Sequence, residues 1–361
     1  MRTLGRDLAM LALAACARQP LDPGPPDPEV EIEPRPGVEA TARAPSLHPI
    51  ASSEHLWTGI ATTDGRLFVS FPRMAPGTVD PPQSVGEILA GDVVPWPDDA
   101  WNAWRPGRPT ADRFVSVQSV VAADGDVWVV DTGNPYGSGV VDRGPMLFRF
   151  DVATGELVRA YAFPRETWTS ASYFNDVRLD GTTAFLTDSG TGGLVVLDLE
   201  TGAAHRALDG HPSTQAEVDH LQIGDRRFDR RVHADGIALS PDGEWLYYAV
   251  LTGHSLWRVP TATLRDPAAD PAARVERVRT IVATDGMIFT PDGDLVLGGL
   301  EDRAVHVLRD GTVYERLIRD DRLSWPDSFA IDEAGDLLVT TTHLHLPPDE
   351  RPAYGLWRIA R

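Results

Sequence analysis

The sequence predicts an all-β protein: a six-bladed β-propeller of four-stranded blades, preceded by a signal peptide and a disordered Pro-rich tether. A tight turn recurs six times, five times as Asp-Gly and once as Ala334-Gly335, and an apolar strand follows each turn. Further short strands continue most of the repeats. Repeats of about 40–50 residues with four short strands each are typical of propeller blades. We therefore divide the chain into a signal peptide (1–15), a tether (16–45) and a propeller (46–361).

The N-terminal residues have the pattern of an export signal. Arg2 and Arg6 flank the start of an apolar run that ends in small residues at Cys16, the only cysteine of the chain. A basic start, an apolar core and small residues before a cleavage site are typical of secretory signals. A thiol at this position is the group that bacterial lipoproteins acylate, although a signal peptide without lipid remains an alternative. We expect an extracytoplasmic protein, anchored through lipidated Cys16 to the outer membrane, periplasm or cell surface of a bacterium.

The tether and the composition limit the kinds of partner and binding site that the protein can have. Residues 16–45 are rich in Pro and lack an apolar period, as expected for an extended segment. The formal net charge of −20 argues against nucleic-acid binding, which needs a basic face. No internal stretch reaches the roughly 18 apolar residues of a membrane span. A single cysteine excludes an intramolecular disulfide and a Cys-based zinc site. We expect a monomer that binds a small molecule.

The six blades of a propeller form a ring, and the last blade must be completed to close it. The chain ends on the third strand of the sixth repeat, at 355–359, so its outer strand has to come from elsewhere. The segment 47–53, which precedes the first repeat, is the natural donor, and such closure hides an open sheet edge. The stretches 90–113 and 209–232 lack a strand pattern, and we interpret them as connections between blades.

The first strands of the six repeats start near the propeller axis. The acids of the Asp-Gly turns lie on the opposite face and form turns. Aligned on their first apolar residue, the strand starts share a column of polar side chains. The column consists of Thr58, Gln118, Asn175, Asp235, Asp285 and Asp327. We expect Gln118, Asn175, Asp176, Asp235, Asp285 and Asp327 to bind the ligand.

Three carboxylates around one narrow axis need a cation, water, protons or salt partners. Calcium with oxygen ligands is one solution, with Asn175, Asp235 and Asp285 as the metal ligands. A hydrated channel neutralised by Arg side chains or backbone amides, and a bound amine, are the other two. No cofactor is certain from the sequence, and these alternatives stay open.

The loops between second and third strands reach the same face. They contain Asp131, Asp188, His254 and His343, among others, and we expect them to form the pocket rim. His254 or His343 could serve as a general base, as could Asp235 or Asp285. No Gly-x-Ser-x-Gly pattern surrounds Ser189, so serine hydrolase chemistry is not expected. The Trp-rich stretch 96–104 either packs against the blade or covers the channel as an aromatic lid.

Several motifs, in order along the chain, resemble the yellow / major royal jelly protein family in a bacterial form. They lie at 95–102, 117–120, 127–133, 173–177, 184–190, 208–213, 233–240 and 325–328. The resemblance spans about 80–345 and implies a secreted six-bladed propeller. Some insect members bind small amines in the central channel, and some are linked to dopachrome conversion, so an isomerase of that type is one implied activity.

A more distant similarity is to the gluconolactonase, regucalcin (SMP-30) and paraoxonase-like propellers. In that family a Glu of the first blade, an Asn and an Asp hold Ca²⁺, and an Asp activates water on a lactone. Asn175 matches the Asn, and Asp235 or Asp285 matches the Asp. Thr58 stands where the Glu would be, which puts both the metal and the lactonase activity in doubt.

The sequence thus leaves three functions. The first is a lipid-anchored propeller that binds a small polar or cationic molecule in its axial pocket. The second is a Ca²⁺-dependent lactonase-like hydrolase, in which a metal polarises the carbonyl. The third is a protein-interaction propeller without catalysis.

Overall fold

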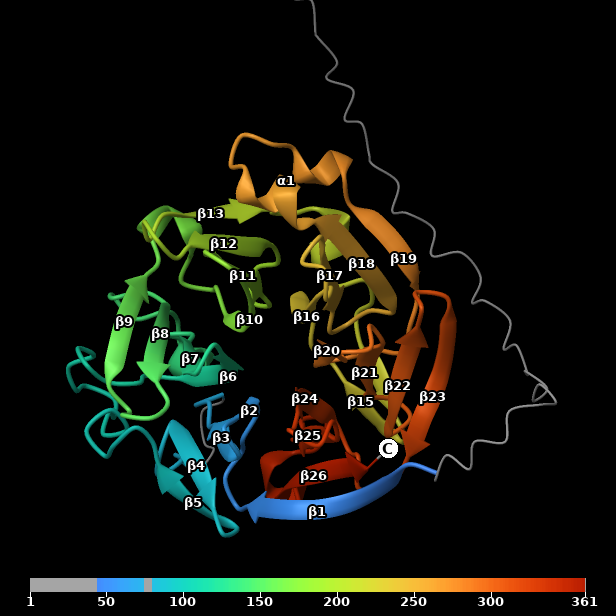
Figure 1. Cartoon of the computed structure of the whole chain (residues 1–361), viewed down its shortest axis with the longest axis horizontal. Helices are drawn as coiled ribbons and strands as arrows, with labels where there is room; N and C mark the ends of the chain where they lie inside the picture. The colour runs from blue at the N-terminus through green and yellow to red at the C-terminus, as the bar shows by residue number, and fades with distance from the viewer. Residues whose placement is uncertain (1–43, 75–79, 361) are drawn as a thin grey trace, which may run out of the picture. The chain divides into compact units, whose positions relative to one another are not determined.

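The computed structural model describes residues 44–74 and 80–360. These residues form six antiparallel four-stranded sheets arranged around a central axis (Figure 1). The predicted six-bladed propeller is therefore confirmed. The predicted signal peptide, Cys16 and the tether up to residue 43 lie outside the described residues. Among the described residues, no helix has the length and apolar character needed to span a membrane.

The first three blades follow the chain in order from the axis outwards. Blade 1 consists of β2 (Ile60–Thr63), β3 (Arg66–Ser70), β4 (Val85–Leu89) and β5 (Asp92–Pro95). Blade 2 consists of β6 (Val117–Ala123), β7 (Asp126–Asp131), β8 (Met146–Asp151) and β9 (Leu157–Ala162). Blade 3 consists of β10 (Phe174–Asp180), β11 (Thr183–Asp188), β12 (Leu194–Asp198) and β13 (Ala204–Ala207).

The last three blades repeat the pattern. Blade 4 consists of β16 (Ala234–Leu239), β17 (Trp245–Val250), β18 (Ser255–Pro260) and β19 (Glu276–Thr280). Blade 5 consists of β20 (Met287–Phe289), β21 (Leu295–Gly299), β22 (Ala304–Arg309) and β23 (Val313–Arg319). Blade 6 consists of β24 (Pro326–Ile331), β25 (Leu337–Thr341), β26 (Tyr354–Ala360) and β1 (Ser46–Ser53).

Helices are few and short. The single α-helix of the described residues is α1 (Thr261–Arg265), in the connection between β18 and β19. The 3-10 helices are η1 (Pro135–Gly137), η2 (Arg165–Thr167), η3 (Pro212–Thr214), η4 (Pro271–Ala273) and η5 (Pro348–Glu350).

The ring closes through β1, as the sequence predicts. β1 pairs antiparallel with β26, from Ser46 opposite Ala360 to Ser53 opposite Tyr354. The first strand of the described chain thus completes the last blade, so that the two ends of the propeller are held together by backbone hydrogen bonds (Figure 1).

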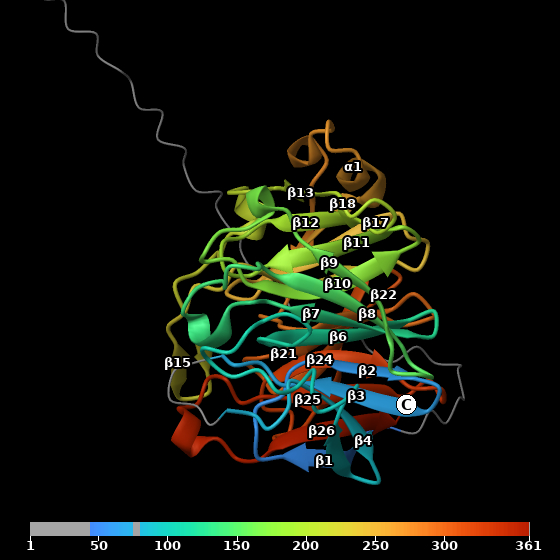
Figure 2. The same ribbon diagram turned by 90° about the vertical axis from the view of Figure 1, so that its left-hand side faces the viewer.

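Both stretches that we interpreted as plain connections contain strands, and this part of the prediction is wrong. The outer strand of blade 1, β5, lies within 90–113, and it is too short to show an alternating pattern. The stretch 209–232 contains a separate hairpin of β14 (Leu221–Ile223) and β15 (Arg226–Phe228). Seen from the side, this hairpin lies at one face of the propeller (Figure 2).

The Asp-Gly turns differ between blades in the position of the turn relative to the paired strands. In blades 1 and 2 both turn residues have positive φ, 50° and 69° at Asp64-Gly65 and 53° and 79° at Asp124-Gly125. Two successive positive φ values define the hairpin turn whose twist matches the strands that it joins. In blade 3, Asp180 still belongs to the strand and pairs with Thr183, which moves the turn by one residue.

The core lies between neighbouring blades, because the strands of each blade are buried on both faces. The Trp-rich stretch 96–104 belongs to this core. Trp96 and Trp101 contact Phe150 at centroid distances of 5.4 and 5.0 Å, and Trp104 is buried. Asn102 fixes the stretch by accepting hydrogen bonds from two backbone N–H groups at the start of β4, in the blade that the stretch follows. The packing interpretation is therefore correct, and the stretch is no lid over the channel.

Candidate functional site

Irregularities in the innermost strands turn the predicted polar column towards the axis. The pairing of first and second strands shifts register at the column position in four blades, at 117–119, 174–177, 234–237 and 326–329. Such β-bulges bend a strand and change the direction of its side chains. A regular strand would send neighbouring residues to opposite faces.

Two glycines let consecutive blades approach each other closely. A Cβ on Gly236 would overlap the carbonyl oxygen of Asp285, and a Cβ on Gly286 would overlap that of Asp327. Each glycine follows a column aspartate directly. The pattern Asp235-Gly236 and Asp285-Gly286 is thus what brings the carboxylates of blades 4, 5 and 6 together.

Amide and carboxyl side chains at the starts of the first strands form the inner end of the site, which we call its floor. Asn175 donates from Nδ2 to Asp235 Oδ2 at 2.9 Å and to Ser189 Oγ at 3.2 Å. Gln118 Oε1 accepts from the Tyr173 hydroxyl at 2.7 Å. These contacts link the neighbouring blades 2, 3 and 4 around the axis.

The three column aspartates are buried and lack a basic partner. Asp285 Oδ2 accepts from the Trp325 indole N–H at 2.7 Å, and Asp327 Oδ1 accepts from the Ser328 hydroxyl at 3.1 Å. Asp235 is 2% exposed, Asp285 6% and Asp327 2%. Within the described part of the chain, none of the three forms an ion pair with an arginine or a histidine. The neutralisation by Arg side chains that the sequence left open does not occur there.

This environment favours the protonated acids. Burial raises the pKa of Asp235 well above its ordinary value, and the charge of Asp285 raises it further. Burial also raises the pKa of Asp285, to about 6. Hydrogen bonds with Trp325 and with the two neighbouring carboxyl groups lower this pKa, but by less than burial raises it. Burial and the charge of Asp285 raise the pKa of Asp327. Burial and mutual repulsion therefore favour protons on this cluster, and the titration of each acid depends on the charge of the others.

A pocket of about 240 Å³ opens above this floor. Its lining includes Gln118, Asn175, Asp235 and Asp285, four of the six ligand-binding residues predicted from the sequence. Asp327 is buried against Ser328, and it does not line the pocket. The volume is slightly below the range of about 300–1,000 Å³ typical of drug-sized ligands, so the pocket suits a small molecule.

Aromatic side chains that the sequence reasoning did not assign form the pocket walls. They are Tyr173, Phe228 and Trp325. Phe228 comes from the β14–β15 hairpin and packs edge-on against Trp325 at 4.9 Å between ring centroids. Tyr173 and Trp325 each precede a column residue by two positions, a spacing that could have revealed them. Nothing local in the sequence places Phe228.

Arg230 and Arg351 also line the pocket. Arg230 is exposed, and Arg351 donates from Nε to the carbonyl of Leu346 at 2.9 Å. Neither forms an ion pair with the column aspartates. The site therefore has acids at its floor and two guanidinium groups that these acids do not neutralise.

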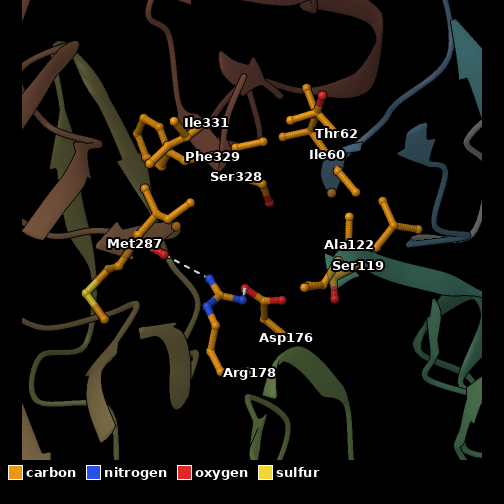
Figure 3. A pocket seen from close by; sticks show the side chains of 17 residues that line it. Ile60, Thr62, Ser119, Ala122, Asp176, Arg178, Met287, Ser328, Phe329 and Ile331 are labelled. Carbon is orange, nitrogen blue, oxygen red and sulfur yellow. Dashed lines mark hydrogen bonds and ion pairs between the residues drawn. The ribbon is translucent and has the colours of Figure 1, made fainter. Parts of the chain in front are cut away.

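Asp176 lies in a second pocket, of about 260 Å³, further along the channel. Its Oδ2 pairs with Arg178 Nη1 at 2.8 Å, and Arg178 Nη2 donates to the Met287 carbonyl at 2.8 Å (Figure 3). Arg178 thus bridges blades 3 and 5. Asp176 does not share a pocket with the other predicted ligand-binding residues.

Neither candidate histidine lines the axial pocket. His254 Nε2 lies 2.8 Å from Glu301 Oε2, and this hydrogen bond raises the pKa of His254. His343 is buried beside Tyr354, and burial lowers its pKa to about 4. Both side chains are engaged away from the floor acids.

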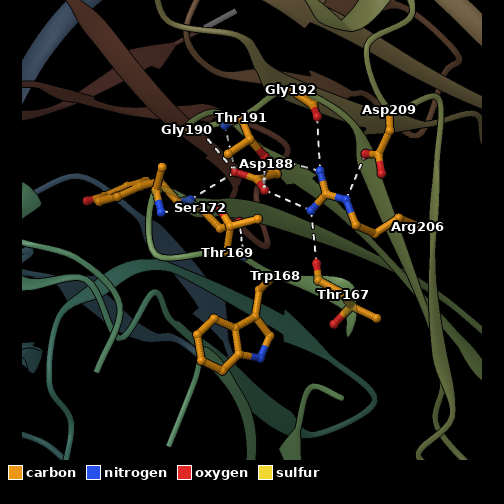
Figure 4. Close-up of polar contacts among 12 residues, drawn as sticks. Thr167, Trp168, Thr169, Ser172, Asp188, Gly190, Thr191, Gly192, Arg206 and Asp209 are labelled. Atoms are coloured by element: carbon orange, nitrogen blue, oxygen red, sulfur yellow. Dashed lines mark hydrogen bonds and ion pairs between the residues drawn. The ribbon is translucent and has the colours of Figure 1, made fainter. Parts of the chain in front are cut away.

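The predicted rim acids Asp131 and Asp188 are structural. Asp188 Oδ1 accepts from the backbone N–H groups of Tyr173, Gly190 and Thr191, and Oδ2 pairs with Arg206 at 2.8 Å (Figure 4). Asp131 accepts from the N–H groups of Val115 and Ser116 and pairs with Arg143. Each acid thus ties the end of a second strand to the start of the first strand in its own blade.

The residues do not fit the calcium site implied by the lactonase-like propellers. Thr58, at the position of the missing Glu, is buried and donates to the Gln118 carbonyl at 2.5 Å. The indole N–H of Trp325 donates to Asp285 Oδ2, which makes that oxygen less available to a cation. Within residues 44–74 and 80–360, no group of three or more His, Cys, Asp or Glu side chains is arranged to hold a metal ion. We therefore assign no calcium to Asn175, Asp235 and Asp285.

Solved structures show the same fold at low sequence identity. A gluconolactonase from Xanthomonas campestris superposes with a TM-score of 0.55 at 14% identity, covering 88% of this chain and 90% of that one. A luciferin-regenerating enzyme gives 0.57 at 12% identity, with 88% and 96% covered. A regucalcin from Agrobacterium tumefaciens, a calcium-binding protein, gives 0.50 at 14% identity, with 86% and 95% covered. These similarities concern the fold alone.

Sequence comparison identifies the family. Major royal jelly protein 3 of Apis mellifera is 23% identical over 207 residues, which cover 53% of this chain and 37% of that protein. The chain thus matches little more than a third of the length of that relative. The family model described as major royal jelly protein matches residues 115–345. Because this match covers more than half of the chain, the protein belongs to the major royal jelly protein family.

Proposed function

We propose that the protein binds a small cationic molecule, an amine with an apolar or aromatic body, in the axial pocket. One observation carries the proposal: Asp235, Asp285 and Asp327 are buried together without a basic partner among the described residues. Three such carboxyl groups are costly to bury unless protons or a cation neutralise them. A ligand ammonium group would replace the protons.

The chemistry of the pocket suits an amine better than a bare ion. An ammonium group donates hydrogen bonds to carboxylates, and such bonds are stronger than neutral ones in a partly water-excluded site. The walls formed by Tyr173, Phe228 and Trp325 give the apolar or aromatic body of the ligand an aromatic surface to pack against. The amine-binding members of the family that the sequence resembles agree with this proposal.

Isothermal titration calorimetry with benzylamine tests the proposal, with benzyl alcohol as the uncharged match. We expect benzylamine alone to bind, with an affinity that rises with pH through about 6, since the cation needs an ionised Asp285. Binding should release protons, seen as a dependence of the measured heat on the buffer. Equal binding of both probes, or an affinity that falls as pH rises, would contradict the proposal.

Two variants locate the site. Asp285→Asn keeps an oxygen for the Trp325 indole but removes the charge, and it should abolish most benzylamine binding. Asp242→Asn, a control of the same chemical change in an exposed turn outside the pocket, should leave it nearly unchanged. If the two variants behave alike, the axial pocket is not the binding site, and the interaction-module alternative gains support.

We also propose that the protein is exported and lipid-anchored through Cys16, on the sequence pattern of residues 1–16. Metabolic labelling with a fatty acid should mark the wild type and not a Cys16→Ser variant. A labelled Cys16→Ser protein, or an unlabelled wild type in a bacterial host with lipoprotein processing, would exclude the anchor.

A further inference from the structure

The axial pocket carries charge of both signs, at separate places. Asp235 and Asp285 form part of its floor, whereas Arg230 and Arg351 line it without contacting these acids. No ion pair joins the two groups, and the main influences on the pKa values of the acids include no arginine. Acids and guanidinium groups in one small pocket ordinarily pair with each other. Here they are held apart.

The insertion between blades 3 and 4 holds one of these cations. Arg230 follows the β14–β15 hairpin, whose Phe228 packs against Trp325, and Trp325 in turn donates to Asp285. The hairpin is thus anchored to the floor through an aromatic side chain. The Arg230 side chain has no hydrogen bond or ion pair with any described residue, which leaves its five N–H donors available to a ligand.

The second cation is fixed in place. Arg351 uses Nε for the Leu346 carbonyl at 2.9 Å and Nη2 for the Leu344 carbonyl at 3.5 Å, and Leu344 itself lines the pocket. The positive potential extends to neighbouring groups. Burial lowers the pKa values of His343 and His345 to about 4, and the charges of Arg303 and Arg351 add to this effect. This side of the pocket therefore repels a second cation and attracts an anion.

We infer that the pocket recognises a small zwitterion whose ammonium and carboxylate groups lie at opposite ends of an aromatic or apolar body. This inference rests on the proposed function, and it adds the anionic end of the ligand. The ammonium meets Asp235 and Asp285, the ring lies among Tyr173, Phe228 and Trp325, and the carboxylate meets Arg230 and Arg351. Separate charges in the ligand match separate charges in the pocket.

The test compares three probes in calorimetry: benzylamine, phenylacetate and 4-(aminomethyl)phenylacetate. We expect the zwitterion to bind about tenfold or more tightly than benzylamine, as one charge-assisted arginine–carboxylate contact accounts for about a factor of ten. Phenylacetate should bind most weakly. The advantage of the zwitterion should shrink at high salt because Arg230 is exposed and screened.

Two arginine variants in or just after the β14–β15 hairpin test the role of Arg230 and provide its control. Arg230→Gln should remove most of the gain of the zwitterion over benzylamine, with Arg351 as the remaining partner, and leave benzylamine unchanged or slightly tighter. Arg227→Gln, three residues earlier and paired with Asp229, should change neither probe. A thermal melt of each variant checks folding.

The outcomes separate the two proposals. Binding of benzylamine without any gain for the zwitterion overturns this inference and leaves the amine site standing. A gain that Arg230→Gln leaves undiminished overturns the assignment of Arg230. Binding of neither cation nor zwitterion overturns the proposed function, and this inference with it.

Discussion

Two groups of buried aspartates in this propeller have opposite environments. Asp131 and Asp188, at the ends of second strands, accept backbone hydrogen bonds and pair with Arg143 and Arg206. Asp235 and Asp285, at the starts of first strands, face a pocket and have no basic partner in the described chain. Residue type and depth of burial are the same, but the partners differ.

The difference appears in the proton affinities. Burial by itself raises the pKa of Asp188, but the charge of Arg206 and the surrounding hydrogen bonds hold it below its ordinary value. For Asp285 burial prevails, and its pKa rises to about 6. A buried acid with a permanent cation serves stability. A buried acid without one is available to a ligand.

The largest expected effect is on stability at the paired group. Asp188→Ala should cost about 3–5 kcal/mol of unfolding free energy, because it leaves three backbone N–H groups without an acceptor and Arg206 with only the exposed Asp209 as counter-charge. Urea unfolding measures the loss. A cost below about 1 kcal/mol would show that the two groups of acids do not differ as described.

At the axis we expect a loss of ligand binding without a loss of stability. Asp285→Asn should leave stability unchanged or raise it, since it removes a charge that the fold disfavours. Benzylamine affinity should fall about tenfold to a hundredfold, the equivalent of one or two hydrogen bonds to a charged group. The same urea and calorimetry experiments measure both quantities. A large loss of stability without a loss of binding would contradict the comparison.

The pH dependence should have opposite signs in the two groups. Between about pH 4 and 6, folded Asp285 holds a proton that the unfolded chain has lost, so its contribution to stability falls as pH rises. Asp188 ionises more readily when folded, so its contribution is present above about pH 4 and is lost as pH falls through its lowered pKa. Unfolding free energies of wild type, Asp285→Asn and Asp188→Asn, measured from about pH 2 to about pH 6, give the two slopes. Slopes of equal sign would refute the assignment.

The smallest effect is expected at His254. Its pairing with Glu301 is half exposed, and such surface pairs contribute about 0–1 kcal/mol. His254→Gln should therefore change stability by less than about 1 kcal/mol and leave benzylamine affinity unchanged in calorimetry. A marked loss of ligand binding would restore His254 to the site.

The repeat pattern allowed much of the fold to be predicted. The turn at Asp124-Gly125 and the strand after it follow from local chemistry, and closure by 47–53 follows from a missing outer strand. The strand β5 escaped prediction because four residues are too few to show a period. The hairpin β14–β15 escaped because its strands have only three residues each.

The candidate site was only partly predictable. The column alignment identified Gln118, Asn175, Asp235 and Asp285, which line the axial pocket, and Asp327, which does not. The expected ligand-binding set also included Asp176, whose side chain lies in the second pocket. The rim acids were misread for a related reason. From sequence, Asp188 and Asp235 look alike, since the partner that distinguishes them, Arg206, is a contact made by folding.

The sequence alone determined the number of blades, the closure of the ring and the column of polar residues at the first strands, because these depend on period and on turn chemistry. Tertiary structure decided which acids are neutralised, which aromatic side chains surround them, and where Arg230 and Arg351 lie. The physical reason is that side-chain direction depends on β-bulges, and charge balance depends on neighbours distant in the chain. Asp285, for example, owes its state to burial, to Trp325 and to the acids of two other blades.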